Sequence, residues 1–370
     1  MKITCSKQSL TNGIGIVSRA VPVNTTMPIL KYILINAAGG EIRLTANDTD
    51  LGIETVIEGV IETSGIAAIE ASVLSEAVRK MPDGDIHIDI NEKDYTVHLT
   101  CDTEKIDFQI TGTSGDDFTY LPEIEKKEPV EISMLAFKDM VRQTAFSLNA
   151  NNENNRTTTG FDMIIYGDYM RLTTLDGHRV SIRNVDFGKE YEKQEVIIPG
   201  KTLKEISAII PSDAEKFVSI YITDNHISFE FDNTVVVSRL IDGEYINVDK
   251  MITSEYKTKV VIDKKRLANS IDRSLFFSKE GNKKPIVVDI KEGVLNIQIK
   301  SSTGGLNEDI EIEKEGNDLT IGFNPKFVLD ALKAIDDDEV TLYFINSISP
   351  VNIKDEKETY IYMILPINLS

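Results

Sequence analysis

The sequence lacks any segment that would take it into or across a membrane. No apolar run approaches the ~18 residues that a membrane-spanning helix needs. The apolar stretch at residues 14–17 is too short for the core of a secretory signal, and Arg19 ends it. We therefore expect a cytoplasmic protein with no membrane partner.

Cysteine and histidine are scarce, and neither stands at the spacing of a metal or redox site. Cys5 and Cys101 form no CxxC pair. None of the four histidines belongs to an HExxH motif. The sequence therefore predicts no metal and no cofactor, and we expect both cysteines to be reduced and buried.

Basic residues are in deficit, which at first argues against nucleic acid as a partner. The 370 residues include 40 Lys and Arg against 60 Asp and Glu, a net charge of -20. Affinity for nucleic acid comes largely from cations that neutralise phosphates. The total does not show where the cations lie along the chain, and their distribution decides the question.

The sequence does have a threefold internal repeat. One amphipathic helix pattern occurs three times, at spacings of 129 and 125 residues. A longer helix pattern near the start of each copy contains Ser18, Ser147 and Ser278, which lie 129 and 131 residues apart. Repetition at this period predicts three similar domains, which we place at residues 1–125, 126–253 and 254–370.

Each repeat combines two helix patterns with many strand patterns. Between the helices, apolar and polar residues alternate and Gly, Asp or Asn stand at the turns, which is typical of antiparallel strands. We therefore expect an α+β fold with two helices and about eight strands in each domain. The helices are expected at residues 6–20, 72–81, 133–149, 200–210, 263–279 and 324–335.

The basic residues concentrate in the expected helices. Those six segments carry 15 Lys and Arg against 6 Asp and Glu, which leaves a net charge of -29 on the rest of the chain. Lysine is a good helix former on a solvated face, but glutamate is equally good and is nearly missing here. We therefore expect all six helices to line one surface that faces a polyanion, with an acidic exterior elsewhere.

Two segments resemble catalytic motifs without completing them. Residues 199–202, Pro-Gly-Lys-Thr, open a helix as a phosphate loop does, but Glu195 stands where that loop needs its first glycine. Residues 176–179, Asp-Gly-His-Arg, carry acid–base groups, yet their equivalent at residues 47–50 has neither His nor Arg. A turn after a strand explains that segment, so we expect no enzyme activity.

Three segments join the repeat in a recognisable order. They are TLDGHR at 174–179, GFNPKFVLDAL at 322–332 and YMILPINLS at 362–370. Together with the repeat they resemble, over the whole chain, the bacterial DNA polymerase III beta sliding clamp family. The resemblance implies a head-to-tail homodimer whose six domains close a ring around duplex DNA and give the replicative DNA polymerase its processivity.

The resemblance also implies the partners and the contact surfaces of such a ring. Other partners would be the clamp loader and the polymerases and repair proteins that carry a clamp-binding peptide. Phe108 and Ile110 of one subunit would meet Phe276 and Phe277 of the other. The residues assigned to the DNA-facing surface are Arg19, Asn24, Arg79, Lys80, Lys138, Arg142, Lys201, Lys204, Lys264, Lys265, Arg266 and Lys326.

A cleft for a partner peptide is implied between the second and third domains. An apolar C-terminal strand beside an Arg-containing turn would form a small hydrophobic pocket with a few polar anchors. The residues that the resemblance assigns to it are Thr158, Leu175, Gly177, His178, Arg179, Val180, Ile246, Lys250, Met251, Asn324, Phe327, Ile348, Met363, Ile364, Leu365, Pro366 and Ile367.

The sequence departs from the family pattern at several of these positions. Thr158 stands near a usual leucine, Ile246 replaces a common proline and Lys250 a common arginine. A pocket with threonine in place of leucine is less apolar, so the preferred peptide is expected to differ. Asn24 replaces a residue that is often basic, which weakens that DNA contact.

A DNA-binding regulator and a hydrolase are the alternatives. A regulator is expected to carry a helix-turn-helix or a zinc finger, and a hydrolase a nucleophile or a metal cluster. A ring differs from both because it stays on circular DNA and leaves once the DNA is made linear.

Overall fold

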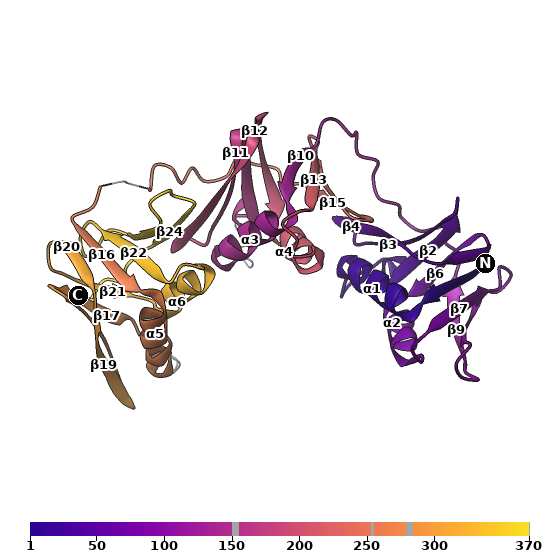
Figure 1. Ribbon diagram of the computed structural model, residues 1–370, viewed down its shortest axis with the longest axis horizontal. Helices are drawn as coiled ribbons and strands as arrows, with labels where there is room; N and C mark the ends of the chain where they lie inside the picture. Colours follow the sequence, from indigo (N-terminus) through magenta and orange to yellow (C-terminus); the bar gives the residue numbers. More distant parts are fainter. Residues whose placement is uncertain (150–154, 253–254, 279–283, 370) are drawn as a thin grey trace. The chain divides into compact units, whose positions relative to one another are not determined.

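The structure is a computed structural model that describes residues 1–149, 155–252, 255–278 and 284–369 (Figure 1). The chain divides into two compact units. The first contains Met1–Met134 and Ala208–Leu240, and the second contains Leu135–Ser207 and Ile241–Ser370. None of the helices in the described part of the chain is long and apolar enough to cross a membrane.

The helices lie where the sequence predicts them, two in each repeat. Two of the predicted helices continue as short 3-10 turns, η1 (Ser18–Ala20) and η3 (Ala145–Ser147). The α-helices are α1 (Lys7–Val17), α2 (Ala71–Lys80), α3 (Met134–Thr144), α4 (Gly200–Ile209), α5 (Lys264–Ser278) and α6 (Pro325–Ala334).

The strands of the first unit form one antiparallel sheet of 13 strands, in the order β10-β13-β14-β15-β4-β3-β2-β6-β9-β8-β7-β1-β5. Its strands are β1 (Lys2–Ser6), β2 (Tyr32–Ala38), β3 (Glu41–Asn47), β4 (Leu51–Ile57), β5 (Val60–Thr63), β6 (Gly65–Glu70), β7 (Asp85–Ile90), β8 (Thr96–Cys101), β9 (Asp107–Thr113), β10 (Val130–Ser133), β13 (Phe217–Ile222), β14 (His226–Phe231) and β15 (Thr234–Arg239).

One strand pair in this sheet joins the first repeat to the second. β15 pairs with β4 from Thr234 opposite Thr55 to Ser238 opposite Leu51. The hydroxyl groups of Thr55 and Thr234 also bond to each other at 2.8 Å in a buried position. Main-chain hydrogen bonds therefore link the two repeats within one sheet.

Helix α1 packs closely on this sheet because a glycine faces it. Its buried residues Leu10, Gly13, Ile14 and Val17 recur at intervals of three and four, as an amphipathic helix requires. A Cβ atom on Gly13 would lie 2.4 Å from the Ile57 side chain, so a larger residue would push the helix off β4.

The second unit contains two antiparallel sheets, ordered β11-β12-β24-β23-β22-β16-β20 and β19-β18-β17-β21. Helices α5 and α6 pack against each other, and α5 also packs against β18 and β19. The strands are β11 (Gly160–Leu175), β12 (Arg179–Pro199), β16 (Thr258–Asp263), β17 (Ile286–Lys291), β18 (Val294–Ser301), β19 (Gly304–Glu311), β20 (Glu313–Gly316), β21 (Leu319–Phe323), β22 (Glu339–Phe344), β23 (Val351–Lys354) and β24 (Tyr360–Ile364).

The second unit joins the second and third repeats in the same way. β12 pairs with β24 from Arg179 opposite Ile364 to Arg183 opposite Tyr360. Successive side chains of β24 then point to opposite faces of the sheet. Ile361 and Met363 pack in one apolar cluster, and Ile364 packs in the core of the third repeat.

The number of strands and one cysteine differ from prediction. In the described residues, nine strands lie in residues 1–125 and nine in 254–370, but six lie in 126–253. The second repeat has fewer because β11 and β12 are long, at 16 and 21 residues. Cys5 is buried as predicted, whereas Cys101 is only partly buried near the end of β8, so that prediction was wrong for Cys101.

Strand β11 buries a carboxylate, Asp162, opposite Ile197 of β12. Among the described residues its Oδ1 atom has no hydrogen-bond partner. Burial, together with the nearby charge of Glu195, raises the pKa of Asp162 to about 7. In the unfolded chain the pKa of this carboxyl is about 4. The folded protein therefore favours the protonated form, and the stability that this gives is fully present at low pH. It is lost as the pH rises from about 4 towards 7.

We expect Asp162→Asn to stabilise the protein more at pH 8 than at pH 5. The neutral amide does not ionise, so the free energy of unfolding of the variant should gain on that of the wild type by about 2–3 kcal/mol over this interval. Urea unfolding at both pH values measures the difference. Asp168→Asn, at an exposed position of the same strand, is the control, and an equal gain there would contradict the role of burial.

Candidate functional site

The turn between β11 and β12 is built by two of its own residues. Gly177 has a φ of +84°, a conformation that favours glycine. The Asp176 carboxylate accepts hydrogen bonds from the backbone N–H groups of His178 at 3.0 Å and Arg179 at 3.2 Å. These contacts fix the direction in which Arg179 leaves the turn at the start of β12.

Arg179 is a buried cation between two carboxylates and two rings. It is only 8% exposed. Its Nε donates to Asp176 at 2.8 Å and its guanidinium to Asp330 of α6 at 2.8 Å. The guanidinium also lies 4.5 Å from the centre of the Phe327 ring and 5.5 Å from that of Phe146. Since both carboxylates are held by hydrogen bonds, Arg179 ties α6 to the turn.

An apolar cluster forms beside this turn. Val180 and Met363 face each other across β12 and β24, and Tyr245 packs against the cluster from the segment after β15. The buried members are Leu175, Val180, Ile182, Val248, Ile361 and Met363. The structure thus brings together Leu175, Val180 and Met363 of the predicted cleft.

The residues that follow β24 are hydrogen-bonded to the turn at His178 and to Gly322 of β21. The Leu365 N–H donates to the carbonyl of His178 at 2.8 Å, and the Ile367 N–H donates to the carbonyl of Gly322, also at 2.8 Å. Leu365 is exposed, while Pro366 and Ile367 are partly buried. Ile364 is the exception among the predicted tail residues, because its side chain lies in the core of the third repeat.

Helix α6 carries two further predicted residues, of which Phe327 contacts the turn. The side chain of Asn324 caps the helix by accepting a hydrogen bond from the Lys326 N–H at 3.0 Å. The Phe327 ring stacks on the His178 ring with centroids 5.7 Å apart. His178, Arg179 and Phe327 therefore form one aromatic and cationic group.

The remaining predicted cleft residues lie outside these contacts. Thr158 is buried, and its hydroxyl donates to the carbonyl of Asn155 at 2.9 Å. Met251 is exposed but its N–H donates to Val248 of the apolar cluster at 2.9 Å. Ile246 and Lys250 are exposed, and Ile348 is 76% exposed. Their membership of the cleft stays a prediction.

Several residues predicted to face DNA are engaged by the protein itself. Arg142 pairs with Asp139 and Asp336 and donates to the carbonyl of Ala334 at 3.2 Å. Lys264 donates to the carbonyl of Ile335 at 2.8 Å. Both cations therefore hold the C-terminal end of α6, where unpaired carbonyl groups attract positive charge.

The other predicted cations lie on exposed or partly buried positions of the helices. Arg79 and Lys80 pair with Glu76 of the same helix, and Lys326 pairs with Asp330 at 3.0 Å. Such surface pairs contribute little stability and exchange easily. Those at exposed positions are Arg19, Arg79, Lys80, Lys201, Lys204, Lys265, Arg266 and Lys326; Lys138 is partly buried, and Asn24 is an exposed loop residue.

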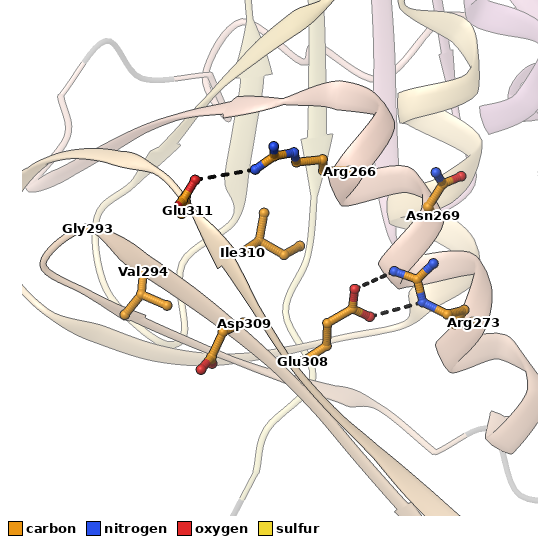
Figure 2. A pocket seen from close by; sticks show the side chains of 9 residues that line it. All are labelled: Arg266, Asn269, Arg273, Gly293, Val294, Glu308, Asp309, Ile310 and Glu311. Atoms are coloured by element: carbon orange, nitrogen blue, oxygen red, sulfur yellow. Dashed lines mark hydrogen bonds and ion pairs between the residues drawn. The ribbon is translucent and has the colours of Figure 1, made fainter.

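A hollow of about 650 Å³ lies between α5 and the β18–β19 hairpin (Figure 2). Arg266 reaches Glu311 at 3.4 Å, and Arg273 is paired with Glu308. The hydrogen bonds from Arg273, and also that from Ser270, hold the pKa of Glu308 below its ordinary value. Because each arginine already faces a carboxylate, this hollow is poorly suited to phosphate.

The residues predicted to join two subunits lie on strand β9 and on helix α5. β19 is the edge strand of its sheet, and Figure 1 shows it projecting beyond β17. Phe276 of α5 is 70% exposed, with its ring centroid 5.1 Å from that of Phe277. Phe108 and Ile110 are partly buried on β9, whose first residues pair with β8.

Comparison with known proteins decides the family. Models of the N-terminal, central and C-terminal domains of the DNA polymerase III beta subunit match residues 1–122, 131–247 and 249–368. A Bacillus subtilis protein named Beta sliding clamp is 30% identical over 381 residues, which covers 99% of both chains. The chain belongs to the DNA polymerase III beta subunit family.

Solved structures of the family have the same fold. A Eubacterium rectale chain assigned to the DNA polymerase III beta subunit is 50% identical, with a TM-score of 0.95 and full coverage of both chains. The DNA polymerase sliding clamp of Bacillus subtilis is 29% identical, with a TM-score of 0.94 and full coverage of both. The predicted resemblance and the fold of three clamp domains are confirmed.

Sequence reasoning missed residues that act through long-range contacts. Asp330 and Phe146 complete the surroundings of Arg179, and Asp336 holds Arg142. The spacing of Lys326 and Asp330, four residues apart on a helix, was a signal for an ion pair. No signal in the sequence linked Phe146 or Asp336 to their partners, which lie far along the chain.

We expect Asp330→Ala to destabilise the protein by about 1–3 kcal/mol, because it leaves a buried donor of Arg179 without its partner. The midpoint of urea unfolding reports the change. Lys326→Ala is the matched control, since it removes the exposed partner of the same carboxylate and should shift the free energy of unfolding by less than about 1 kcal/mol. Equal losses in the two variants would show that Arg179 does not depend on Asp330.

Proposed function

We propose that this chain is a DNA sliding clamp: a homodimeric ring that encircles duplex DNA, gives the replicative polymerase its processivity and catalyses no reaction itself. The observation that carries the proposal is the presence of three clamp domains in one chain, with the whole length matched to a Beta sliding clamp. Two such chains supply six domains, the number that the resemblance to the family implies for a closed ring.

The charge of the helices supports duplex DNA as the partner. The six helical segments are net basic although the chain carries a net charge of -20. Cations that contact phosphate without reading bases hold DNA and let the protein slide along it. Lys265, Lys201 and Lys204 are exposed on α5 and α4 and are better candidates than Arg142 and Lys264, which hold the end of α6.

The strand edges support a head-to-tail dimer. An open edge such as that of β19 presents unpaired main-chain groups that a strand of another chain can meet. We infer that β19, Phe276 and Phe277 of one subunit meet β9, Phe108 and Ile110 of its partner. Because the two patches differ, each subunit offers one of each kind, and two contacts close the ring.

We infer that the turn at Gly177 and the segment after β24 form the cleft for partner peptides of the polymerase, the clamp loader and repair proteins. The apolar side chains of a peptide would enter beside Val180, Met363 and Leu365. Arg179 is held by Asp176 and Asp330, so we assign it to shaping the cleft rather than to pairing with an acidic peptide residue.

Domain boundaries near residues 125 and 253 are part of the proposal. β9 ends at Thr113 and β10 begins at Val130, while β15 ends at Arg239 and β16 begins at Thr258. Boundaries near these residues would leave every described strand intact, which supports the division. We place the protein on DNA in the cytoplasm, in keeping with a role in replication.

The ring predicts topological retention on DNA. After loading by the clamp loader of the same cell, the wild type should co-elute with a nicked circular plasmid in gel filtration and be released once a restriction enzyme makes the plasmid linear. Release from circles and linear DNA at the same rate would contradict encirclement.

A variant of the inferred interface tests the dimer in the same assay. Phe277→Ala should weaken the dimer by about 3 kcal/mol, the lower end for a buried phenylalanine, and shorten retention on circles. Sedimentation of the wild type should give about twice the chain mass of 41.3 kDa. Phe187→Ala, at a partly buried position of β12 outside the inferred interface, is the control and should leave both measurements unchanged.

Deletion of residues 365–370 is expected to abolish binding of a fluorescent peptide that contains one Gln and three large apolar residues. Burial of about 200 Å² of apolar ligand surface gives roughly 5 kcal/mol before ordering of the peptide is subtracted, so wild-type affinity should be micromolar. Deletion of residues 368–370 alone keeps the backbone hydrogen bonds of Leu365 and Ile367 and should retain most of the affinity. Full polymerase stimulation by the longer truncation would overturn the cleft assignment.

A further inference from the structure

Four aromatic side chains gather on the second repeat, in the middle of the paired strands β11 and β12 (Figure 1). The ring centroids of Tyr166 and Tyr169 are 6.2 Å apart, and those of Phe187 and Tyr191 are 5.1 Å apart. In the register of the two strands Tyr191 is opposite Gly167, so the first ring pair lies next to the second. These four aromatic residues are called the aromatic patch below.

The main chain at the patch departs from regular pairing. The register shifts on both sides of Gly167, and between Asp186 and Tyr191 strand β12 has four residues where β11 has one. Gly167 has a φ of +59° and Gly188 a φ of +70°, conformations that favour glycine. An irregularity of this kind turns side chains out of the regular alternation of a strand, which is how aromatic rings come to lie outside the core.

The patch leaves aromatic surface in contact with water. Tyr166 is 55% exposed, and Tyr169, Phe187 and Tyr191 are only partly buried. A single exposed ring is ordinary on a protein surface. Four rings within one short stretch of two paired strands form a larger apolar surface, and such a surface is typical of a contact site for another molecule.

The charge around the patch is negative. Asp168 is exposed beside Tyr166, and residues 186–192 carry three carboxylates, those of Asp186, Glu190 and Glu192, against one lysine. All three carboxylates are at exposed positions. Carboxylates repel a phosphate backbone, so this surface favours a cationic protein segment over nucleic acid.

The combination of rings and carboxylates suits arginine in particular. A guanidinium group is flat, stacks on an aromatic face and pairs with carboxylates through several N–H donors, whereas an ammonium group is a compact point charge. The patch already holds one cation in this way, because the Lys189 Nζ lies 5.0 Å from the centre of the Tyr191 ring. Tyr166, with Asp168 two residues further on, offers both groups to an incoming side chain.

We propose that the aromatic patch is a second docking surface, which binds an arginine-containing segment of a partner protein. A guanidinium group stacks on Tyr166, and the neighbouring carboxylates pair with the positive charges of the segment. The surface is separate from the peptide cleft, since Tyr169 precedes Asp176 by seven residues, roughly 20 Å along a strand. A partner that engages both surfaces is held at two points, which raises its overall affinity.

The test measures fluorescence anisotropy of two labelled peptides with the full-length protein. In one peptide arginine alternates with glycine, and in the other lysine replaces every arginine. Low ionic strength is used because exposed charges are screened by salt. The arginine peptide should bind about threefold to tenfold more tightly than the lysine peptide, since only the guanidinium group both stacks and pairs.

Substitution of Tyr166 identifies the contact. Tyr166→Ala should weaken binding of the arginine peptide by about threefold to tenfold, and Tyr166→Phe should retain the affinity because the ring remains. Tyr120→Ala is the matched control: Tyr120 is 54% exposed and its ring contacts that of Phe118, but it lies outside the patch. This control should bind the arginine peptide as the wild type does.

Removal of the carboxylates tests the charge. The double variant Asp186→Asn and Glu190→Gln should weaken binding of the arginine peptide by about twofold to fivefold, as expected for exposed ion pairs. Glu356→Gln, at an exposed position outside the patch, should leave the affinity unchanged. An equal loss in this control would show that the peptide responds only to the overall charge of the chain.

Three outcomes would overturn the proposal. The first is equal affinity for the arginine and lysine peptides with no effect of Tyr166→Ala, which would leave only attraction to the net charge of -20. The second is displacement of the arginine peptide by an excess of the unlabelled cleft peptide, which would place it in the cleft. The third is binding of labelled single-stranded DNA that Tyr166→Ala abolishes, which would assign the rings to stacking of bases.

The result is independent of the proposed function. The arginine peptide is measured without circular DNA and without the cleft peptide, so failure of DNA retention or of the cleft leaves the patch in place. In the same way, failure of the patch leaves the clamp function and the cleft assignment untouched.

Discussion

Main-chain hydrogen bonds between strands of different repeats are the constraint on which the rest of the molecule depends. β15 of the second repeat pairs with β4 of the first, and β12 of the second pairs with β24 of the third. Each pairing fixes a register, and a shift of one residue would turn every side chain of a strand to the opposite face. The positions of Val180 and Met363 side by side follow directly from the register of β12 and β24.

The position of β12 in its sheet also determines which groups of the inferred cleft are available to a peptide. The turn before β12 directs Arg179 towards α6, where Asp330 and Phe327 hold it. Because its charge is already paired, Arg179 holds the turn and α6 together. It has correspondingly less capacity to bind a carboxylate of an incoming peptide. We infer that recognition by the cleft rests on apolar surface and on main-chain groups of the turn rather than on a charge pair with Arg179.

Local patterns predicted the local structure well. The six helices, the alternating strands and the turn at Gly177 follow from spacing and from residue type, because these features are decided by neighbours in the chain. The face to which Ile364 points was not predicted, since it depends on the register with β12. The engagement of Arg142 by Asp336 was also missed, because it joins residues 194 positions apart. Likewise, the sequence identifies basic helix residues such as Lys265. It does not distinguish those that stay exposed from those that bind the C-terminal end of α6.

The position of β24 in its sheet also bears on how the protein is made. A ribosome adds residues 360–367 after β12, β23 and α6, the elements with which β24 pairs or packs. A nascent chain therefore has an unpaired β12 edge until this last segment emerges, and an unpaired edge invites association with other strands. The surface inferred to bind partners is therefore complete only after residues 360–367 have been added.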